Sequence, residues 1–263
     1  MYKRQLDARV VPLNAAPDPR MSARDWEPSE SSLQVLAEVV RASGAGLGVA
    51  HDGDADRVAV LDERGRWVPA EHLLILLARR LKARTVAVPI NASAVLRDAL
   101  PGVEFRYTPV GDVHVSHALR RDRLDLGGEP SGTFVLPRWS LCPDAPYAAA
   151  VVARIVQEEG PLSSLLGALP AYANVSAKLP VADGAREAAM GRVAAEVRGL
   201  GGTVTELDGI RADFEDGWLL VRASGTEPVV RVTAESRQRA RAEALLEQGK
   251  RLVARHANAE ARP

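Results

Sequence analysis

The spacing of apolar and polar residues changes along the chain and divides it into three parts. In residues 1–66, a polar entry is followed by helical spacing over 31–42 and then by two short apolar runs that are typical of strands. Two strands alone leave sheet edges unpaired. We therefore interpret this part as the carboxy-terminal remnant of a domain, and we expect poor solubility when the chain is expressed alone.

Residues 67–172 alternate between strand-like and helix-like segments. Helical spacing covers 73–81, 92–100, 113–121 and 144–160, and strand-like runs cover 85–90 and 104–110. This alternation predicts an α/β domain, in which a parallel sheet is flanked by helices on both faces.

The pattern changes again in residues 173–263. A strand-like run over 174–181 precedes a helical segment over 184–199, then three short strands and a charged helix over 237–256. We predict a smaller α+β domain with an antiparallel sheet. Acidic residues are interspersed with the arginines of the last helix, which favours a solvated helix face over a surface for nucleic acid.

Composition narrows the classes of partner. The chain has 263 residues, of which 46% are hydrophobic, enough for about two domains. Its 34 basic and 34 acidic residues balance, so nothing attracts nucleic acid or an anionic membrane, and a small-molecule partner fits better. No apolar run approaches the roughly 18 residues of a membrane span. Cys142 is the only cysteine, which suits a reducing compartment, and we expect a cytoplasmic protein.

The segment HDGDADR places three carboxylates at alternating positions between two strand-like runs: Asp52, Asp54 and Asp56. Crowded carboxylates repel one another, so the cluster predicts a bound cation such as Mg²⁺, Ca²⁺ or Mn²⁺. An acidic turn without metal is the alternative. An EF-hand would use Glu63 as its last ligand, but Arg57 stands where that loop needs glycine, and the flanking runs are not helical.

The segment RASGTEP lies between two further strand-like runs and could hold a phosphate. Arg222 can form a bidentate fork, Gly225 can let backbone N–H groups turn toward an anion, and two hydroxyls can donate, those of Ser224 and Thr226. The alternative is an ordinary hairpin turn.

The segment GGEPSG carries one carboxylate and one hydroxyl on a rigid turn. Glu129 can accept from two vicinal hydroxyls, and Ser131 can donate and accept, which suits the binding of a sugar ring. The alternative is a glycine-rich turn without a ligand.

In their order along the chain, the three loops resemble those of the α-D-phosphohexomutase superfamily, enzymes that move phosphate between carbons 1 and 6 of a hexose. HDGDADR is similar to its metal loop, GGEPSG to its sugar-specificity loop and RASGTEP to its phosphate loop. TPVGD, NAAPDPR and WEPSESSL resemble connecting segments. Within the superfamily, the residues of these loops are most similar to those of archaeal-type phosphoglucosamine mutases. Phosphomannomutases and phosphoglucomutases share the loops, and many carry His where this chain has Thr133.

The resemblance implies a mechanism and a set of ligands. Mg²⁺ would be held by the three aspartates, Arg57 would lie beside the transferring group, and the substrates would be a hexose phosphate and a hexose bisphosphate. Glu129 and Ser131 would bind sugar hydroxyls. The far phosphate would be clamped by Arg222, Ser224, Gly225 and Thr226, with help from Arg231.

One family segment has no counterpart here. The family's first domain carries a phosphorylated serine in a Thr-Ala-Ser-His-Asn-Pro type loop, and the chain contains no such segment. The first residues, MYKRQ, resemble a sequencing-adapter scar. We therefore expect the carboxy-terminal part of a longer enzyme, inactive without the missing amino-terminal domain. A naturally short, non-catalytic sugar-phosphate binding module is the alternative.

Overall fold

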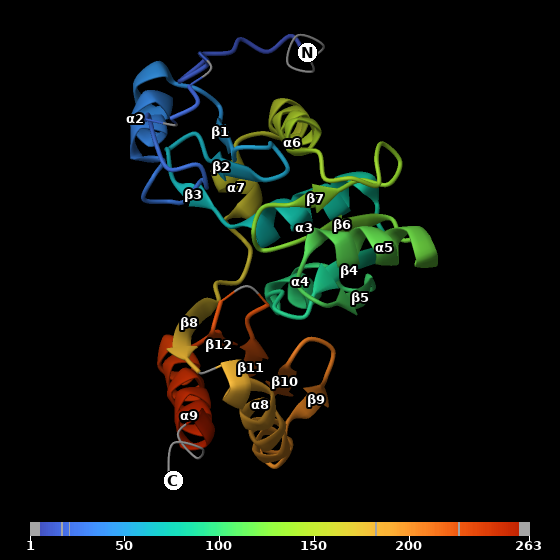
Figure 1. Cartoon of the computed structure of the whole chain (residues 1–263). Coiled ribbons are helices and arrows are strands. Elements are labelled where there is room, and N and C mark those ends of the chain that lie inside the picture. The colour runs from blue at the N-terminus through green and yellow to red at the C-terminus, as the bar shows by residue number, and fades with distance from the viewer. Residues whose placement is uncertain (1–5, 17, 21, 182, 226, 258–263) are drawn as a thin grey trace. The chain divides into compact units, whose positions relative to one another are not determined.

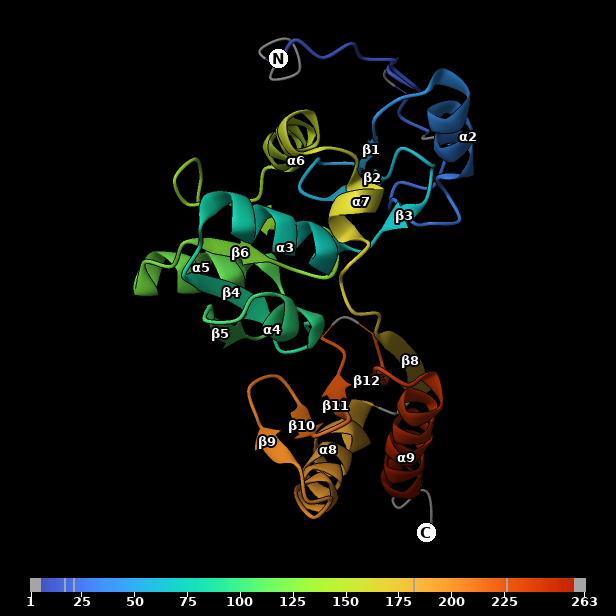
Figure 2. The same cartoon turned by 180° about the vertical axis from the view of Figure 1, so that it is seen from behind.

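The computed structural model describes residues 6–16, 18–20, 22–181, 183–225 and 227–257. Its helices and strands are labelled in Figure 1 and seen from behind in Figure 2. The chain forms two compact units. The first consists of residues 1–92, 96–107 and 111–169, and the second of residues 93–95, 108–110 and 170–263.

A three-stranded antiparallel sheet opens the first unit. Helix α2 (Gln34–Ser43) precedes strands β1 (Gly48–His51), β2 (Val58–Leu61) and β3 (Trp67–Val68), which pair in the order β1-β2-β3. Leu33, Ala37 and Leu61 belong to the core between helix and sheet. The expected helix starts three residues later than predicted, and the two-residue strand β3 was not predicted. The acidic segment connects β1 to β2 in a hairpin, which confirms that it is not an EF-hand.

The second sheet of this unit has four strands in the order β5-β4-β6-β7. Strands β4 and β6 are parallel, whereas β6 and β7 are antiparallel because the chain turns back directly after β6. The elements are α3 (Ala70–Leu81), β4 (Thr85–Pro89), α4 (Val95–Ala99), β5 (Glu104–Thr108), α5 (Asp112–Asp122), β6 (Leu126–Gly128), β7 (Phe134–Val135), α6 (Ala145–Glu159) and α7 (Leu162–Leu166).

Helices cover both faces of this sheet. A Cβ atom on Gly127 would meet Leu119 of α5 at 2.8 Å, whereas one on Gly128 would meet Leu74 of α3 at 2.8 Å. Neighbouring residues of a strand point to opposite faces, so α3 and α5 lie on opposite sides of β6. The α/β class is therefore confirmed, with the correction that the sheet is mixed.

The second unit is an antiparallel sheet with two long helices. The strands pair in the order β8-β12-β11-β10-β9, one strand more after the first helix than was predicted. The elements are β8 (Ala173–Pro180), α8 (Asp183–Arg198), β9 (Thr203–Thr205), β10 (Ile210–Phe214), β11 (Gly217–Ala223), β12 (Val229–Ser236) and α9 (Arg239–Ala257). The predicted α+β class with an antiparallel sheet is confirmed.

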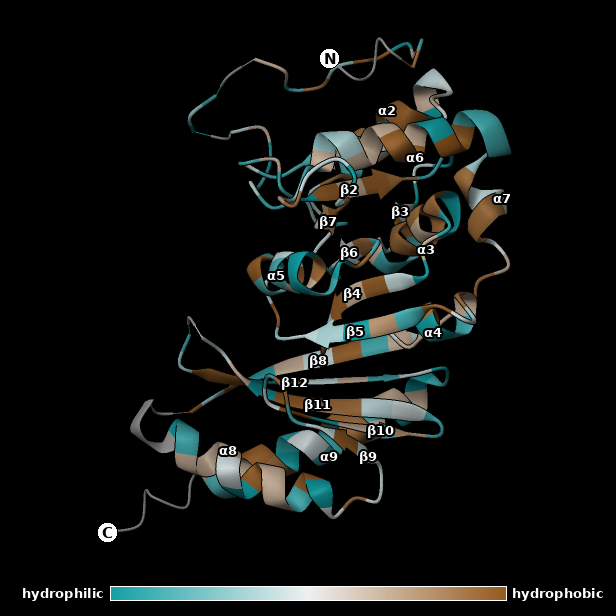
Figure 3. Cartoon of the chain, turned by 90° about the vertical axis from the view of Figure 1, so that its right-hand side faces the viewer, coloured by the Kyte–Doolittle hydropathy of each residue, from teal (hydrophilic) through white to brown (hydrophobic). Residues whose placement is uncertain are grey.

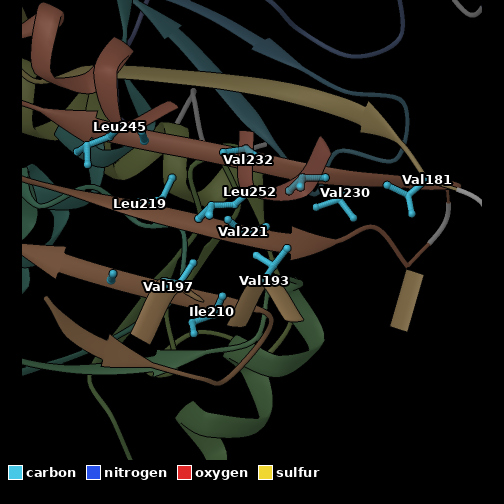
Figure 4. Packing of buried hydrophobic residues seen from close by; sticks show 13 residues of the cluster. Val181, Val193, Val197, Ile210, Leu219, Val221, Val230, Val232, Leu245 and Leu252 are labelled. Atoms are coloured by element: carbon cyan, nitrogen blue, oxygen red, sulfur yellow. The ribbon is translucent and has the colours of Figure 1, made fainter. Parts of the chain in front are cut away.

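The core of this unit lies between one face of the sheet and the two helices. Val221 and Val232 from the strands meet Val193 of α8 and Leu245 of α9 in one buried cluster (Figure 4). The helix α8 carries both hydrophobic and hydrophilic positions along its length (Figure 3), as expected for a helix with one buried side. Within the described part of the chain, no helix combines the length and the apolar character needed to cross a membrane.

Candidate functional site

The acidic loop between β1 and β2 brings its three carboxylates together. One oxygen from each of Asp52, Asp54 and Asp56 lies within 4.8 Å of the others. Ala55 has a φ of 61°, in the left-handed region that residues other than glycine rarely adopt. Its carbonyl oxygen accepts a hydrogen bond of 3.4 Å from the amide of Ala145, at the start of α6. The loop is thus held in an unusual turn by a contact outside itself.

The electrostatics of this loop suit a cation. Burial raises the pKa of Asp56 to about 6, helped by its hydrogen bond to Asp52 and by the charges of Asp52 and Asp54, while Arg57 opposes the rise. The Oδ1 atom of Asp56 is buried and has no hydrogen-bond partner among the described residues. A divalent ion between the carboxylates would relieve both the repulsion and the unmet acceptor, so the donor set fits the hard cation expected from the sequence.

Arg57 lies at the edge of the carboxylate cluster. Its amide donates to Asp52 Oδ1 at 3.1 Å, and its Nε lies 3.6 Å from both Asp52 Oδ2 and Asp56 Oδ1. Its Nη1 donates to Glu27 Oε1 at 2.9 Å. This role of Glu27 was not predicted, because a carboxylate thirty residues upstream carries no local sign of the contact.

The acidic loop and the GGEPSG loop meet at an isolated antiparallel bridge between Arg57 and Thr133. The amide of Val58 donates to the Gly132 carbonyl at 3.0 Å. Gly132 has a φ of 92°, and a Cβ atom there would lie 2.5 Å from the Val58 carbonyl oxygen, so only glycine fits this close approach. Two loops that are far apart in sequence thereby form one candidate site.

Glu129 is fixed within that site. Its Oε1 accepts from the Gly111 amide at 2.8 Å, at the start of α5, and its Oε2 accepts from Ser131 Oγ at 3.5 Å. Burial raises the pKa of Glu129 and the charge of Asp112 adds to the rise, while the Gly111 amide, Ser131 and Arg57 lower it. The structure therefore brings Glu129, Ser131, Arg57 and the aspartates together, and it adds Gly111 of the TPVGD segment.

In the second unit, the RASGTEP loop connects β11 to β12. The Ser224 amide donates to the Val229 carbonyl at 2.9 Å, and Ser224 Oγ accepts from the Glu227 amide at 3.3 Å. A Cβ atom on Gly225 would meet nothing within 4 Å and its φ is not positive, so the expected need for glycine does not arise from this backbone conformation. Thr226 lies outside the described residues.

Charged side chains surround the RASGTEP loop. Arg222 Nη1 lies 3.4 Å from Asp208 Oδ2, and Arg231 Nη2 lies 2.5 Å from Glu227 Oε2. Lys178 Nζ lies 3.0 Å from Glu227 Oε1. The two arginines were predicted from the sequence, whereas Lys178 and Asp208 were not, since only the pairing of strands brings them near the loop. Glu227 lies within the RASGTEP segment itself, but its contacts with Lys178 and Arg231 were not predicted.

Models of three consecutive family domains match this chain. Those of phosphoglucomutase/phosphomannomutase alpha/beta/alpha domains II and III match residues 2–65 and 69–172, and that of the C-terminal domain matches residues 177–251. The chain therefore belongs to the phosphoglucomutase/phosphomannomutase family, which confirms the resemblance seen in the sequence.

Comparison with individual proteins also places the chain in this family. The chain is 40% identical over 252 residues to a probable phosphoglucosamine mutase of Methanocella arvoryzae, covering 96% of this chain and 58% of that protein. A family protein of Burkholderia thailandensis superposes with a TM-score of 0.84 at 25% identity, covering 98% and 57% of the two chains. Aspergillus fumigatus N-acetylphosphoglucosamine mutase, in complex with GlcNAc-6P and magnesium, has the same fold at a TM-score of 0.56 and 19% identity, covering 80% and 48%. The chain thus spans about half the length of these relatives.

Proposed function

We propose that this chain carries the metal, sugar and phosphate sites of a phosphohexomutase that interconverts hexose 6-phosphate and hexose 1-phosphate through a phosphoserine and a bisphosphate intermediate. The observation that carries this proposal is the bridge between Arg57 and Thr133, which joins the acidic loop to the GGEPSG loop. We assign residues 1–66 to the remnant of the second mutase domain, 67–172 to the sugar-binding domain and 173–263 to the phosphate-binding domain.

Mg²⁺ would be held by Asp52, Asp54 and Asp56. When bound, the ion supplies Lewis-acid stabilisation of charge on a phosphoryl oxygen. Support comes from the clustered oxygens, from the unmet Oδ1 of Asp56 and from the magnesium complex of the Aspergillus relative. Mg²⁺ commonly combines a few carboxylates with phosphate oxygens, which favours it over the other hard cations.

The side chains of this chain would bind and orient the substrate. Arg57 carries a fixed positive charge beside the carboxylates and would hold the transferring phosphoryl group through its guanidinium. Glu129 would accept hydrogen bonds from sugar hydroxyls, and Ser131, which is exposed, would donate or accept there.

The phosphate that does not react would be clamped by Arg222, Ser224, Gly225, Thr226 and Arg231. The open space around Gly225 leaves room for an anion to approach the backbone. In a bisphosphate intermediate the two ends of the sugar are alike, so one clamp can serve both half-reactions.

Glucosamine phosphate is the favoured substrate because of the 40% identity to a probable phosphoglucosamine mutase. Mannose and glucose phosphates remain the alternative substrates.

Non-catalytic binding is a second candidate function, favoured by the lack of a Thr-Ala-Ser-His-Asn-Pro type segment in this sequence. A covalent phosphoryl carrier is required for turnover, so the chain alone should bind sugar phosphate without converting it.

Calorimetric titration of the full chain with glucosamine 6-phosphate tests the proposal, with and without Mg²⁺. We expect saturable binding that Arg222→Ala weakens, together with no formation of the 1-phosphate. Glucose 6-phosphate and mannose 6-phosphate serve as competitors. Absence of sugar-phosphate binding would refute the proposal, and turnover by the chain alone would refute the assignment of the missing nucleophile.

A further inference from the structure

Three basic side chains lie side by side across β8, β12 and β11. Arg231 of β12 is paired with Lys178 of β8 on one side and with Arg222 of β11 on the other. Directly paired residues of antiparallel strands point to the same face of a sheet. Their neighbours Val221 and Val232 belong to the buried core, so the three cations lie on the face opposite to α8 and α9.

Glu227 holds two of these cations. Both of its carboxylate oxygens contact Lys178 Nζ, at 3.0 and 3.1 Å, and Oε2 also accepts from Arg231 Nη2 at 2.5 Å. The hydrogen bond from Lys178 is the main reason why the pKa of Glu227 lies below its ordinary value, and the charge of Arg231 adds to this. The side chains of Lys178 and Glu227 are 53% and 42% exposed, so water and solutes can reach the pair.

These three cations can still bind an anion, because one of their donor atoms is not used by any described residue. Arg231 Nε is buried and has no hydrogen-bond partner among the described residues. The loop carbonyls of Ser224 and Glu227 are already occupied, since both accept from Arg186 Nη1 at 3.0 and 2.9 Å. These two carbonyl oxygens, which would repel a phosphate, are therefore bound to Arg186 instead.

Distances across the sheet allow one anion to meet all three cations. Neighbouring strands are about 4.8 Å apart, so the backbones of β8 and β11 are about 10 Å apart with β12 between them. The long side chains of Lys178 and Arg222 can both bend toward a group above Arg231. A phosphate dianion offers more charge and more acceptor oxygens than one carboxylate.

We propose that Lys178 is a further phosphate-binding residue, and that Glu227 is an internal carboxylate which keeps Lys178 and Arg231 in place until the substrate phosphate displaces it. This inference rests on the proposed function, because it extends the same phosphate clamp by one cation. Glu227 thereby competes with substrate phosphate, and its removal has the opposite effect to removal of Lys178.

Calorimetric titration of the full chain with glucosamine 6-phosphate and with inorganic phosphate, at constant ionic strength, tests this directly. Lys178→Met should weaken binding about fivefold, the size expected for one exposed charge contact. Lys178→Arg should retain most of the affinity. Lys250→Met is the matched control, since it removes a lysine from another exposed pair, 2.6 Å from Glu247 on α9, and should change nothing.

Glu227→Gln should tighten binding about twofold to fivefold, because the competing charge is lost while the shape is kept. A purely structural role for the pair predicts weaker binding in both variants, so the opposite signs are diagnostic. Unchanged affinity in Lys178→Met, or weaker binding in Glu227→Gln, overturns the inference if Arg222→Ala still weakens binding. If the wild type binds no phosphate, or Arg222→Ala has no effect, the proposed function itself fails.

Discussion

Gly132→Ala should loosen the junction between the acidic loop and the GGEPSG loop. The new Cβ atom would lie 2.5 Å from the Val58 carbonyl oxygen, at a φ of 92°. The left-handed backbone conformation costs an L-residue about 1–2 kcal/mol. Moving the loops apart would also break the 3.0 Å hydrogen bond from the Val58 amide, worth about 1 kcal/mol. We expect a local loss of about 2–3 kcal/mol.

Hydrogen exchange of the full chain, measured on peptides covering 52–60 and 126–135, reports this loss locally. Exchange in both segments should rise in Gly132→Ala, while α9 stays unchanged. Gly46→Ala is the control in the same unit, because its Cβ atom would meet only Val156 Cγ1, at an ordinary 3.8 Å. If Gly132→Ala exchanges like Gly46→Ala, the close approach that we derive for this junction is wrong.

Three further outcomes are expected. Arg222→Ala should weaken binding of glucosamine 6-phosphate by about 1.5–3 kcal/mol in calorimetry, and unchanged affinity would mean that the loop is only a hairpin. Asp54→Asn should weaken Mg²⁺ binding at least about tenfold, since affinity follows the number of charged ligands, and equal Mg²⁺ isotherms would count against the metal site. Asp62→Asn should lower the free energy of unfolding by about 1–3 kcal/mol at pH 7, because Asp62 is buried and bonded to Arg66. Although burial opposes it, hydrogen bonding to Arg66 and Arg64 lowers the pKa of Asp62, so this stabilisation is present above the ordinary pKa of about 3.9 and is lost as the pH falls through the lower folded value. The difference from wild type in urea unfolding should therefore shrink below pH 4, and a constant difference would contradict the assignment.

Elements with a strong period could be predicted from the sequence. The helices α3, α5, α6 and α9 were found because their apolar spacing extends over several turns. The strand β3 (Trp67–Val68) and the five-residue helix α7 were missed, since neither is long enough to show a period. The reversal of β7 was also missed, because a short turn and a crossover to a parallel strand leave similar polar segments in the sequence.

For the candidate site, the residues could be recognised in the sequence but most of their contacts could not. The aspartates were recognisable because they are neighbours in the sequence, and Glu129 and Ser131 share one turn. The contacts that fix them were not recognisable, since Glu27 reaches Arg57 and Gly111 reaches Glu129 only after folding. The position of Lys178 beside Arg231 depends on the register of β8 and β12. A shift of one residue would place Lys178 on the other face of the sheet.

The acidic loop is fastened at more than its two strand ends. The Ala55 carbonyl is bound by the Ala145 amide, and Arg57 is bridged to Thr133. Surface connections usually accept added or deleted residues. Here an insertion between His51 and Val58 would pull at both attachments, so we expect this half-buried loop to tolerate length variation as poorly as a buried strand does.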